Sequence, residues 1–322
     1  MEAIPLNLIS TKEQEVKGLG LLDAFSLMSL YFIDYLNAMD VEHSSLDQQA
    51  MKSRFGTSLY QAGVHVKRGA LVQPAALVRG LGDNQPNNVR LIENCPVLKV
   101  QLGNPITLQL ADSEIKTDKL VMAINYEAPK LGFLRRRLIG STLSGSFTRK
   151  LTPQELASLG SYETWGIISL HGGGATLRLT KDGRICLRNT AEYSGAALLS
   201  TKVLEARQVI HRSSFEKRFP QLAHVPFEYA WSGVEGISGN GTNFFGQQRK
   251  NIYLAGGYNG SGVSKRTAFG HALAEYAGGG QSGLITDCLG SETATWLPPR
   301  PFLDVGAMLK ISARFRGVGL DR

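Results

Sequence analysis

The sequence contains few cysteines, and none lies in a pattern typical of metal or disulfide chemistry. The three that are present, Cys95, Cys186 and Cys288, are far apart, with no C-x-x-C pair and no cysteine–histidine cluster. This spacing argues against a zinc site and against a disulfide-stapled fold, and it fits a reducing compartment. We therefore expect a cytoplasmic protein that binds no metal.

The sequence also lacks the segments that direct a protein into a membrane. Residues 1–18 show no basic stretch followed by an apolar core, so we expect no secretory signal peptide. The longest apolar stretch, residues 21–36, is interrupted by two aspartates and two serines. A helix that crosses a bilayer needs about 20 predominantly apolar residues, so we expect no membrane span.

The chain is basic, but it lacks a nucleic-acid-binding motif. Lysine and arginine number 35 against 27 acidic residues, which gives a formal net charge of +8. The basic residues are dispersed, apart from residues 135–137 and the tail around Lys310, Arg314 and Arg316. We interpret them as a solvated surface and expect no nucleic-acid partner.

Length and patterning predict two domains of different kinds. The 322 residues are enough for two modest hydrophobic cores. Residues 138–233 change to alternating strands, and Asp182-Gly183 joins two alternating runs in a tight hairpin. We also expect helices over residues 21–39, 75–81, 201–219 and 307–315, strands over residues 58–66, 89–92 and 120–125, and a hairpin over residues 106–117, while residues 46–55 fit either a helix or a polar connection.

One stretch, residues 251–279, combines a strand, a glycine loop and a helix. Its sequence is NIYLAGGYNGSGVSKRTAFGHALAEYAGG, in which an apolar run precedes a loop with four glycines in seven residues. Apolar residues then recur at helical spacing until Gly278 and Gly279. Glycine lets the loop backbone approach a ligand, and the N–H groups of the first helical turn can face an anion. The pattern is equally compatible with a tight turn that binds nothing.

The sequence of this stretch resembles that of the D-amino-acid-oxidase-like FAD-dependent oxidoreductases, which include glycine, sarcosine and γ-glutamylputrescine oxidases. Other landmarks follow in that family's order across residues 54–279. The resemblance implies a mixed α/β fold with a partial, discontinuous FAD-binding Rossmann-like domain (residues 1–137 and 234–322) and an antiparallel-sheet substrate domain (residues 138–233). The landmarks are Pro74 before a helix, Val97, a strand ending at Ala123 and Asn125, R-x-T-x-D-G-R from Arg178, F-P-x-L from Phe219 and W-x-G from Trp231.

The resemblance implies FAD as cofactor and oxidation of an amine or amino acid C–N bond to an imine. A substrate carboxylate would suit an arginine, for which Arg178 is the candidate, and Tyr258 is a candidate for the pocket wall. A surface arginine, a packed tyrosine and a core strand with a turn-forming asparagine remain alternatives. The cofactor-binding residues that the resemblance implies are Val97, Ala123, Asn125, Gly256, Gly257, Tyr258, Asn259, Gly260, Ser261, Gly262 and Val263.

The sequence has no counterpart of the unit with which relatives begin. That unit is a strand, G-x-G-x-x-G, a helix and an acidic residue about 20 residues later. Residues 18–25, GLGLLDAF, follow a charged segment and not a strand. We therefore expect an N-terminally shortened member that alone binds FAD weakly or not at all, unless a partner chain supplies the missing unit. The alternative is a non-catalytic remnant or binding protein without FAD.

Overall fold

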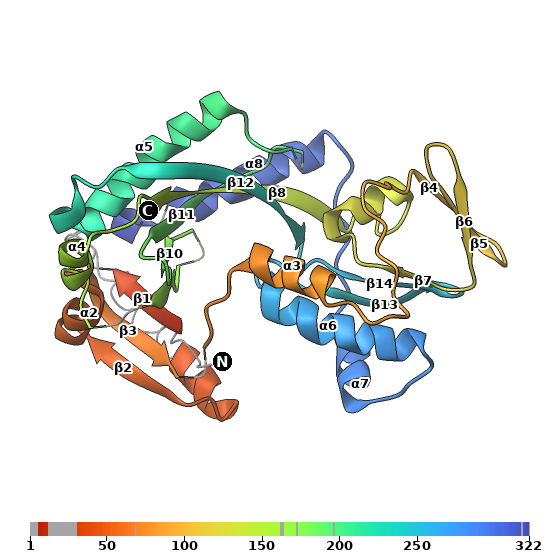
Figure 1. Cartoon of the computed structure of the whole chain (residues 1–322), viewed down its shortest axis with the longest axis horizontal. Helices are drawn as coiled ribbons and strands as arrows, with labels where there is room; N and C mark the ends of the chain where they lie inside the picture. Colours follow the sequence, from red (N-terminus) through yellow and green to blue (C-terminus); the bar gives the residue numbers. More distant parts are fainter. Residues whose placement is uncertain are drawn as a thin grey trace.

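The structure is a computed structural model that describes residues 6–11, 31–67, 69–161, 164–171, 173–195, 197–316 and 318–321. The described residues form three sheets, and two of them mark the main parts of the molecule (Figure 1). The larger, with helix α5 (Thr201–Arg218) lying over it, occupies the left of the view. The smaller, with helices α6 (Gly262–Ala277) and α7 (Gly283–Gly290), lies to the right.

The large sheet has eight strands in the order β12-β8-β11-β10-β9-β1-β3-β2. All neighbours are antiparallel except β1 and β9, which pair in parallel. Three of these strands come from residues 6–66, outside the 138–233 segment that the sequence predicted as the sheet domain. The strands are β1 (Leu6–Thr11), β2 (His43–Asp47), β3 (Tyr60–Val66), β8 (Leu138–Thr148), β9 (Trp165–Ser169), β10 (Thr176–Leu179), β11 (Ile185–Glu192) and β12 (Phe227–Ser238).

The predicted hairpin and the predicted helix over residues 201–219 are both confirmed in this part. Gly183 has a φ of 76°, which suits the Asp-Gly turn between β10 and β11. Aromatic side chains form the core between the sheet and α5. The ring of Trp165 lies 5.8 Å from that of Phe55 and 6.0 Å from that of Phe219. Two short helices close the edges, α2 (Gln48–Phe55) and α4 (Pro153–Ala157).

The smaller sheet has the order β13-β14-β7 and carries the glycine-rich stretch. Strand β14 (Ile252–Gly256) is buried throughout and runs parallel to β7 (Leu120–Met122) and antiparallel to β13 (Phe244–Arg249). Helix α6 packs against it through Phe269 and Tyr276, whose rings contact Phe245. The predicted succession of strand, loop and helix is confirmed.

A third sheet of three short strands contains the predicted hairpin. It consists of β4 (Lys99–Gln101), β5 (Ile106–Gln109) and β6 (Glu114–Thr117). The helix predicted after Pro74 is also present, as α3 (Pro74–Asp83). Residues 89–92, predicted as a strand, form no regular element. Their apolar side chains produced the prediction, but no neighbouring strand pairs with them among the described residues.

Three further predictions differ from the structure in their boundaries. The strand predicted over 120–125 ends at Met122, and a 3₁₀ helix η1 (Asn125–Leu131) follows; its first residue, Asn125, has a φ of 47°, which is not a strand conformation. The C-terminal helix α8 (Phe302–Arg316) starts earlier than predicted, directly after Pro301. The predicted helix over 21–39 is seen from residue 31 to residue 38; its first part, and residues 18–25, lie outside the described residues.

The described residues contain neither a membrane-spanning helix nor a metal-binding cluster. None of their helices combines the length and hydrophobicity needed to cross a bilayer. In the same part of the chain, no three histidine, cysteine or acidic side chains come close enough together to hold a metal ion.

Candidate functional site

The loop between β14 and α6 is shaped by positions where a side chain would not fit. Gly257 has a φ of 69° and Gly260 a φ of 87°, values that favour glycine. A Cβ on Gly257 would lie 2.8 Å from Leu138 Cδ2, and one on Gly256 would lie 3.3 Å from the Cα of Asn125. The loop backbone therefore lies directly against Leu138 and Asn125. We call this loop, residues 256–262, the glycine cradle.

Asn125 connects this loop to the two sheets. Its Oδ1 accepts a hydrogen bond from the Gly257 N–H at 2.8 Å. The same oxygen would lie 2.3 Å from a Cβ on Gly236, a residue of β12. Because β7 and β14 are parallel, their carboxyl ends meet at one edge, where α/β folds commonly bind ligands. The structure thus brings Asn125 together with Gly256 and Gly257, three of the predicted cofactor-binding residues.

Asn259 holds the loop in place through both polar atoms of its side-chain amide. Its Oδ1 accepts from the Ser238 N–H at 3.0 Å, and its Nδ2 donates to the carbonyls of Thr242 at 3.1 Å and Gly257 at 2.5 Å. Its own N–H donates to the Gly236 carbonyl at 3.2 Å. These bonds tie the loop to the end of β12, so the side chain of this predicted residue shapes the cradle.

The N-terminus of α6 lies at the open side of the loop. Ser261 is the N-cap residue, but its side chain makes no capping bond, and the first turn holds no acidic residue. The first N–H groups of a helix then remain available to an anion. Gly260, Ser261 and Val263 are exposed, whereas Gly262 is half-buried. This end of the helix fits a phosphate or an electron-rich ring edge.

The remaining predicted residues around the loop differ in burial. Tyr258 is buried against α6, with its ring 5.9 Å from that of Phe269, and burial raises its pKa. The Arg266 guanidinium lies 5.5 Å from the Tyr258 ring, so this tyrosine packs between two α6 side chains. Ala123 is exposed at the end of β7, and Val97 is half-buried in the coil before β4.

Arg178 lies on the face of the large sheet that points away from α5. Its neighbours Leu177 and Leu179 are buried in the core, and side chains alternate along a strand. Its Nη1 donates to the Leu177 carbonyl at 3.0 Å. Burial lowers the pKa of Arg178, and the charge of Arg188 acts in the same direction.

Sequence reasoning missed the side chains that surround Arg178. Cys186 is its partner across the hairpin, and Arg188 donates to Thr176 Oγ1 at 3.0 Å on the same face. Burial raises the pKa of the Cys186 thiol to about 11. The Asp-Gly turn fixes this register, so the sequence did hold the signal that Cys186 and Arg188 share a face with Arg178.

Strand β12 connects this face to the glycine loop. Trp231 lies across Gly145 of β8, where an added Cβ would come within 2.9 Å of the Trp231 ring. Four residues further along β12, and hence on the same face, Glu235 reaches the loop, and its Oε2 would lie 3.3 Å from a Cβ on Gly260. The sheet face from Arg178 to Glu235 and the loop therefore border one region.

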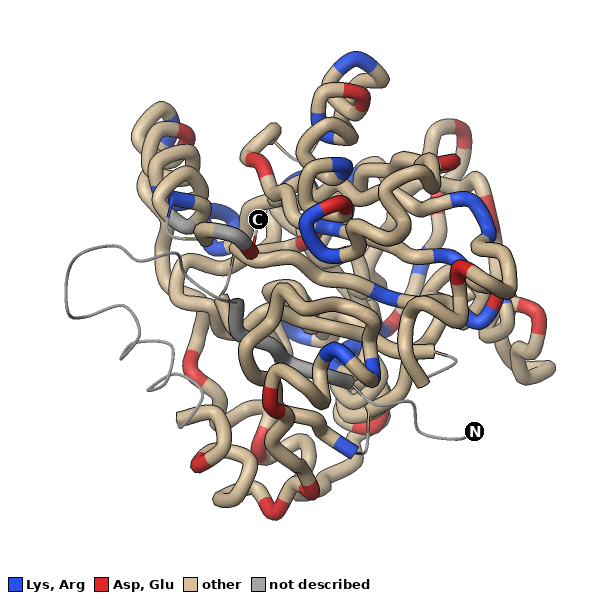
Figure 2. The backbone as a smooth tube through the Cα atoms, turned by 90° about the vertical axis from the view of Figure 1, so that its left-hand side faces the viewer, with Lys and Arg blue, Asp and Glu red and all other residues tan. Residues whose placement is uncertain are grey.

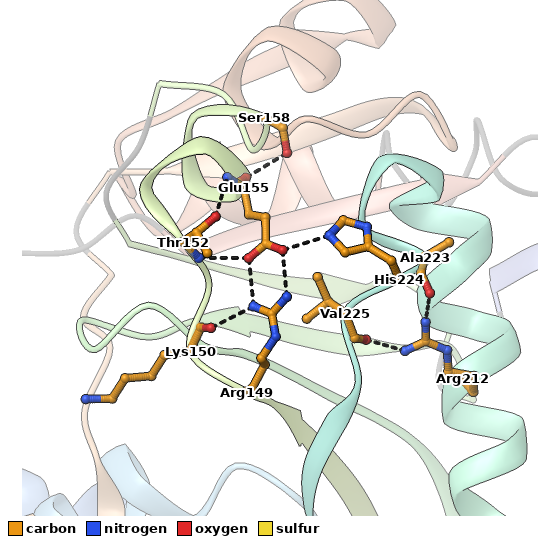
Figure 3. A network of polar contacts seen from close by, with 9 residues as sticks. All are labelled: Arg149, Lys150, Thr152, Glu155, Ser158, Arg212, Ala223, His224 and Val225. Carbon is orange, nitrogen blue, oxygen red and sulfur yellow. Dashed lines mark hydrogen bonds and ion pairs between the residues drawn. The ribbon is translucent and has the colours of Figure 1, made fainter.

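A separate polar network lies at the α4 end of the large sheet, away from the glycine loop (Figure 1, Figure 3). Glu155 accepts two bonds from Arg149 at 2.7 and 2.8 Å, and one from His224 at 2.8 Å. It also accepts the Thr152 N–H at 2.8 Å, which completes a capping box. Chiefly the bond from Arg149 holds the pKa of Glu155 well below its usual range. Because its partners are internal, we assign this network to structure.

Comparison with known families and curated proteins gave consistent matches. Residues 15–276 match the family model described as "FAD dependent oxidoreductase". The probable oxidoreductase OrdL of Haemophilus influenzae is 23% identical over 243 residues, which cover 71% of this chain and 52% of that protein. The gamma-glutamylputrescine oxidoreductase of Escherichia coli is 24% identical over 233 residues, 71% of this chain and 53% of that protein. The chain thus spans about half the length of these relatives.

Solved structures agree on the fold. The L-proline dehydrogenase of P. horikoshii superposes with a TM-score of 0.71 at 16% identity, over 89% of this chain and 75% of that one. The glycine oxidase of Geobacillus kaustophilus gives a TM-score of 0.70 at 16% identity, over 88% of this chain and 72% of that one. The predicted mixed α/β fold with a large, mostly antiparallel sheet is confirmed.

Proposed function

The chain belongs to the FAD dependent oxidoreductase family, and on this basis we propose that it oxidises the C–N bond of a small amine or amino acid to an imine. The names of its relatives support this substrate class, since they include a gamma-glutamylputrescine oxidoreductase, a glycine oxidase and an L-proline dehydrogenase. The observation that carries the proposal is the glycine cradle between β14 and α6, which Asn125 joins to β12. Cysteine usage supports a cytoplasmic location.

The residues of the cradle fit FAD. Gly256 and Gly257 let the loop backbone pack against Asn125 and Leu138. The uncapped N-terminus of α6, where Ser261 and Val263 are exposed, suits electron-rich or anionic groups. When bound, FAD supplies the hydride acceptor, and the chain holds and orients the reacting groups. The residues that would hold it are Val97, Ala123, Asn125, Gly256, Gly257, Tyr258, Asn259, Gly260, Ser261, Gly262 and Val263.

Arg178 would hold the carboxylate of an amino-acid substrate. No carboxylate among the described residues pairs with it, although its side chain is half-buried. A guanidinium removed from water is stabilised by an anion that it can bind through two hydrogen bonds. Tyr258 would act indirectly on the substrate pocket: its ring packs against Phe269 of α6 and so holds the glycine loop in position.

A partner chain would complete the cofactor site. Among the described residues, no strand pairs with the outer edge of β7, and Val121 there is 47% exposed. Helix α3 buries no residue, and Leu77, Val78 and Leu81 on it are between 40% and 67% exposed. Parallel sheets are normally covered on both faces. An added α/β unit with a glycine-rich phosphate loop would cover this surface and bind the FAD pyrophosphate.

The same uncovered surface favours a second candidate, a binding protein that holds no FAD. To separate the two, the purified chain is mixed with FAD, desalted and examined by visible absorption. Retained flavin bands that bleach anaerobically with glycine, sarcosine, proline or γ-glutamylputrescine would support the oxidoreductase. A folded but colourless protein would refute autonomous catalysis and support the second candidate or the need for a partner.

A further inference from the structure

Helix α8 presents an apolar face to solvent. Phe302, Val305, Met308 and Leu309 are between 55% and 70% exposed. At about 100° per residue, these four positions fall within an arc of about 120° on the helix, which is the width of an amphipathic stripe. Apolar side chains gathered in this way mark an interaction surface, unlike the scattered apolar exposure of ordinary protein surfaces. We call these four residues the α8 stripe.

The opposite side of α8 is attached to the large sheet. Asp304 accepts a hydrogen bond from the Tyr193 hydroxyl at 2.7 Å, and Lys310 Nζ donates to the Gly239 carbonyl at 3.2 Å. Leu303, Ala307 and Ile311 are half-buried, and α8 contacts β11. The α8 stripe is therefore the outward face of a docked helix.

Cations lie at both ends of the α8 stripe. The Arg300 side chain is 65% exposed just before the helix, and Arg316 is exposed at its end. The one acidic residue of α8, Asp304, is engaged by Tyr193 and lies 3.3 Å from Arg300. In Figure 2 both basic and acidic segments lie close to the C-terminus, and the two are interspersed over the rest of the chain.

A neighbouring segment has the same chemistry. Trp296 is 64% exposed, with the guanidinium groups of Arg137 and Arg136 at 4.7 and 5.8 Å from its ring centroid. The next residue, Leu297, lies beside Gly239, since its Cδ2 would be 3.0 Å from a Cβ there, and Lys310 binds the Gly239 carbonyl on the docked side of α8. Tryptophan with arginine is typical of the boundary between water and lipid.

We propose that the α8 stripe docks on an anionic phospholipid bilayer. The apolar side chains would enter the interface while Arg300 and Arg316 contact lipid phosphates. A second copy of the chain fits less well, because antiparallel two-fold pairing along the stripe would set Arg300 of one helix against Arg316 of the other. The positive charges of Arg300 and Arg316 therefore favour an anionic bilayer over a second copy of the chain.

The test is co-sedimentation of the full chain with lipid vesicles. We expect binding to vesicles of equal parts phosphatidylglycerol and phosphatidylcholine, at least about fivefold weaker binding to phosphatidylcholine alone, and loss of binding as salt rises from about 0.15 M to 1 M. The triple variant Val305→Ser/Met308→Ser/Leu309→Ser should fall to the phosphatidylcholine level. The matched control Val78→Ser/Leu81→Ser, which changes apolar residues of α3 exposed by 66% and 67%, should bind as the unsubstituted chain does.

Three outcomes would overturn the proposal. Failure of the chain to bind either kind of vesicle would rule out a lipid surface. Equal vesicle binding by the triple variant and the unsubstituted chain would show that the contact with lipid lies outside the α8 stripe. If the unsubstituted chain forms a dimer in solution, the triple variant is a monomer and neither binds vesicles, the α8 stripe is an interface between two copies of the chain. Circular dichroism of both variants checks that the fold is retained, which the outward position of these side chains predicts.

Discussion

Replacing Asp321 with alanine should destabilise the core of the large sheet. This residue ends the short 3₁₀ turn η3 (Gly319–Asp321) and is 1% exposed, while the Arg218 side chain is fully buried. Arg218 Nη2 donates to Asp321 Oδ1 at 2.6 Å and to its carbonyl at 2.7 Å. The substitution removes the carboxylate but leaves the guanidinium in place, held by Tyr60 and Ser214.

The expected loss follows from the burial of both partners. Breaking a buried ion pair by removing one member costs about 3–5 kcal/mol, because an uncompensated charge stays in the interior. Typical free energies of unfolding are about 5–15 kcal/mol, so the variant should lose a large part of its stability. Adding Arg218→Met removes the stranded charge, and the double variant should recover part of the loss.

Urea unfolding followed by intrinsic fluorescence measures the effect, because Trp165 lies in the same core as Phe219. The matched control is Asp304→Ala, whose side chain is 33% exposed and whose partner Arg300 is 65% exposed. An exposed pair contributes about 0–1 kcal/mol. A loss for Asp321→Ala no larger than that of the control would refute the reasoning, and so would no recovery in the double variant.

Three other substitutions give sharp expectations. Burial lowers the pKa of His211 to about 4 from 6.5, so the fold favours the neutral ring; stability should fall as pH drops from 6.5 towards 4, by up to about 3 kcal/mol. His211→Gln should flatten that part of the pH profile of unfolding. Asn125→Ala removes the acceptor of the Gly257 N–H and should cost about 1–3 kcal/mol and reduce retained flavin absorbance. Gly145→Ala places a methyl 2.9 Å from the Trp231 ring and should lower the thermal midpoint through about 1–3 kcal/mol of overpacking; an unchanged midpoint would contradict the tight contact.

Local signals predicted the parts of the fold that depend on neighbours in sequence. The Asp182-Gly183 turn specified the β10–β11 hairpin, and the glycine loop specified the change from β14 to α6. The apolar run at residues 89–92 was misleading, because strand propensity without a pairing partner does not form a strand. The sequence also held no sign that residues 6–11 pair with β9, since such pairing depends on tertiary contacts.

The candidate site was predictable to a similar degree. The sequence resemblance to the family indicated Asn125 and the glycines. The structure shows the hydrogen bond between Asn125 and Gly257. The resemblance did not indicate that the amide of Asn259 is used within the loop. Trp231 and Arg188 both pair with Gly145 of the intervening strand β8, an alignment that no pattern in either segment could reveal.

The position of β1 has a consequence for the time course of folding. It lies between β9 and β3, with Leu6 opposite Gly166 on one side and Val66 on the other. During synthesis β1, β2 and β3 emerge well before β9, so the edge of β1 must wait for a partner about 160 residues later. Contacts this distant slow folding, and an unpaired edge invites aggregation. We therefore expect refolding yields to fall with protein concentration and to improve when a chaperone shields that edge.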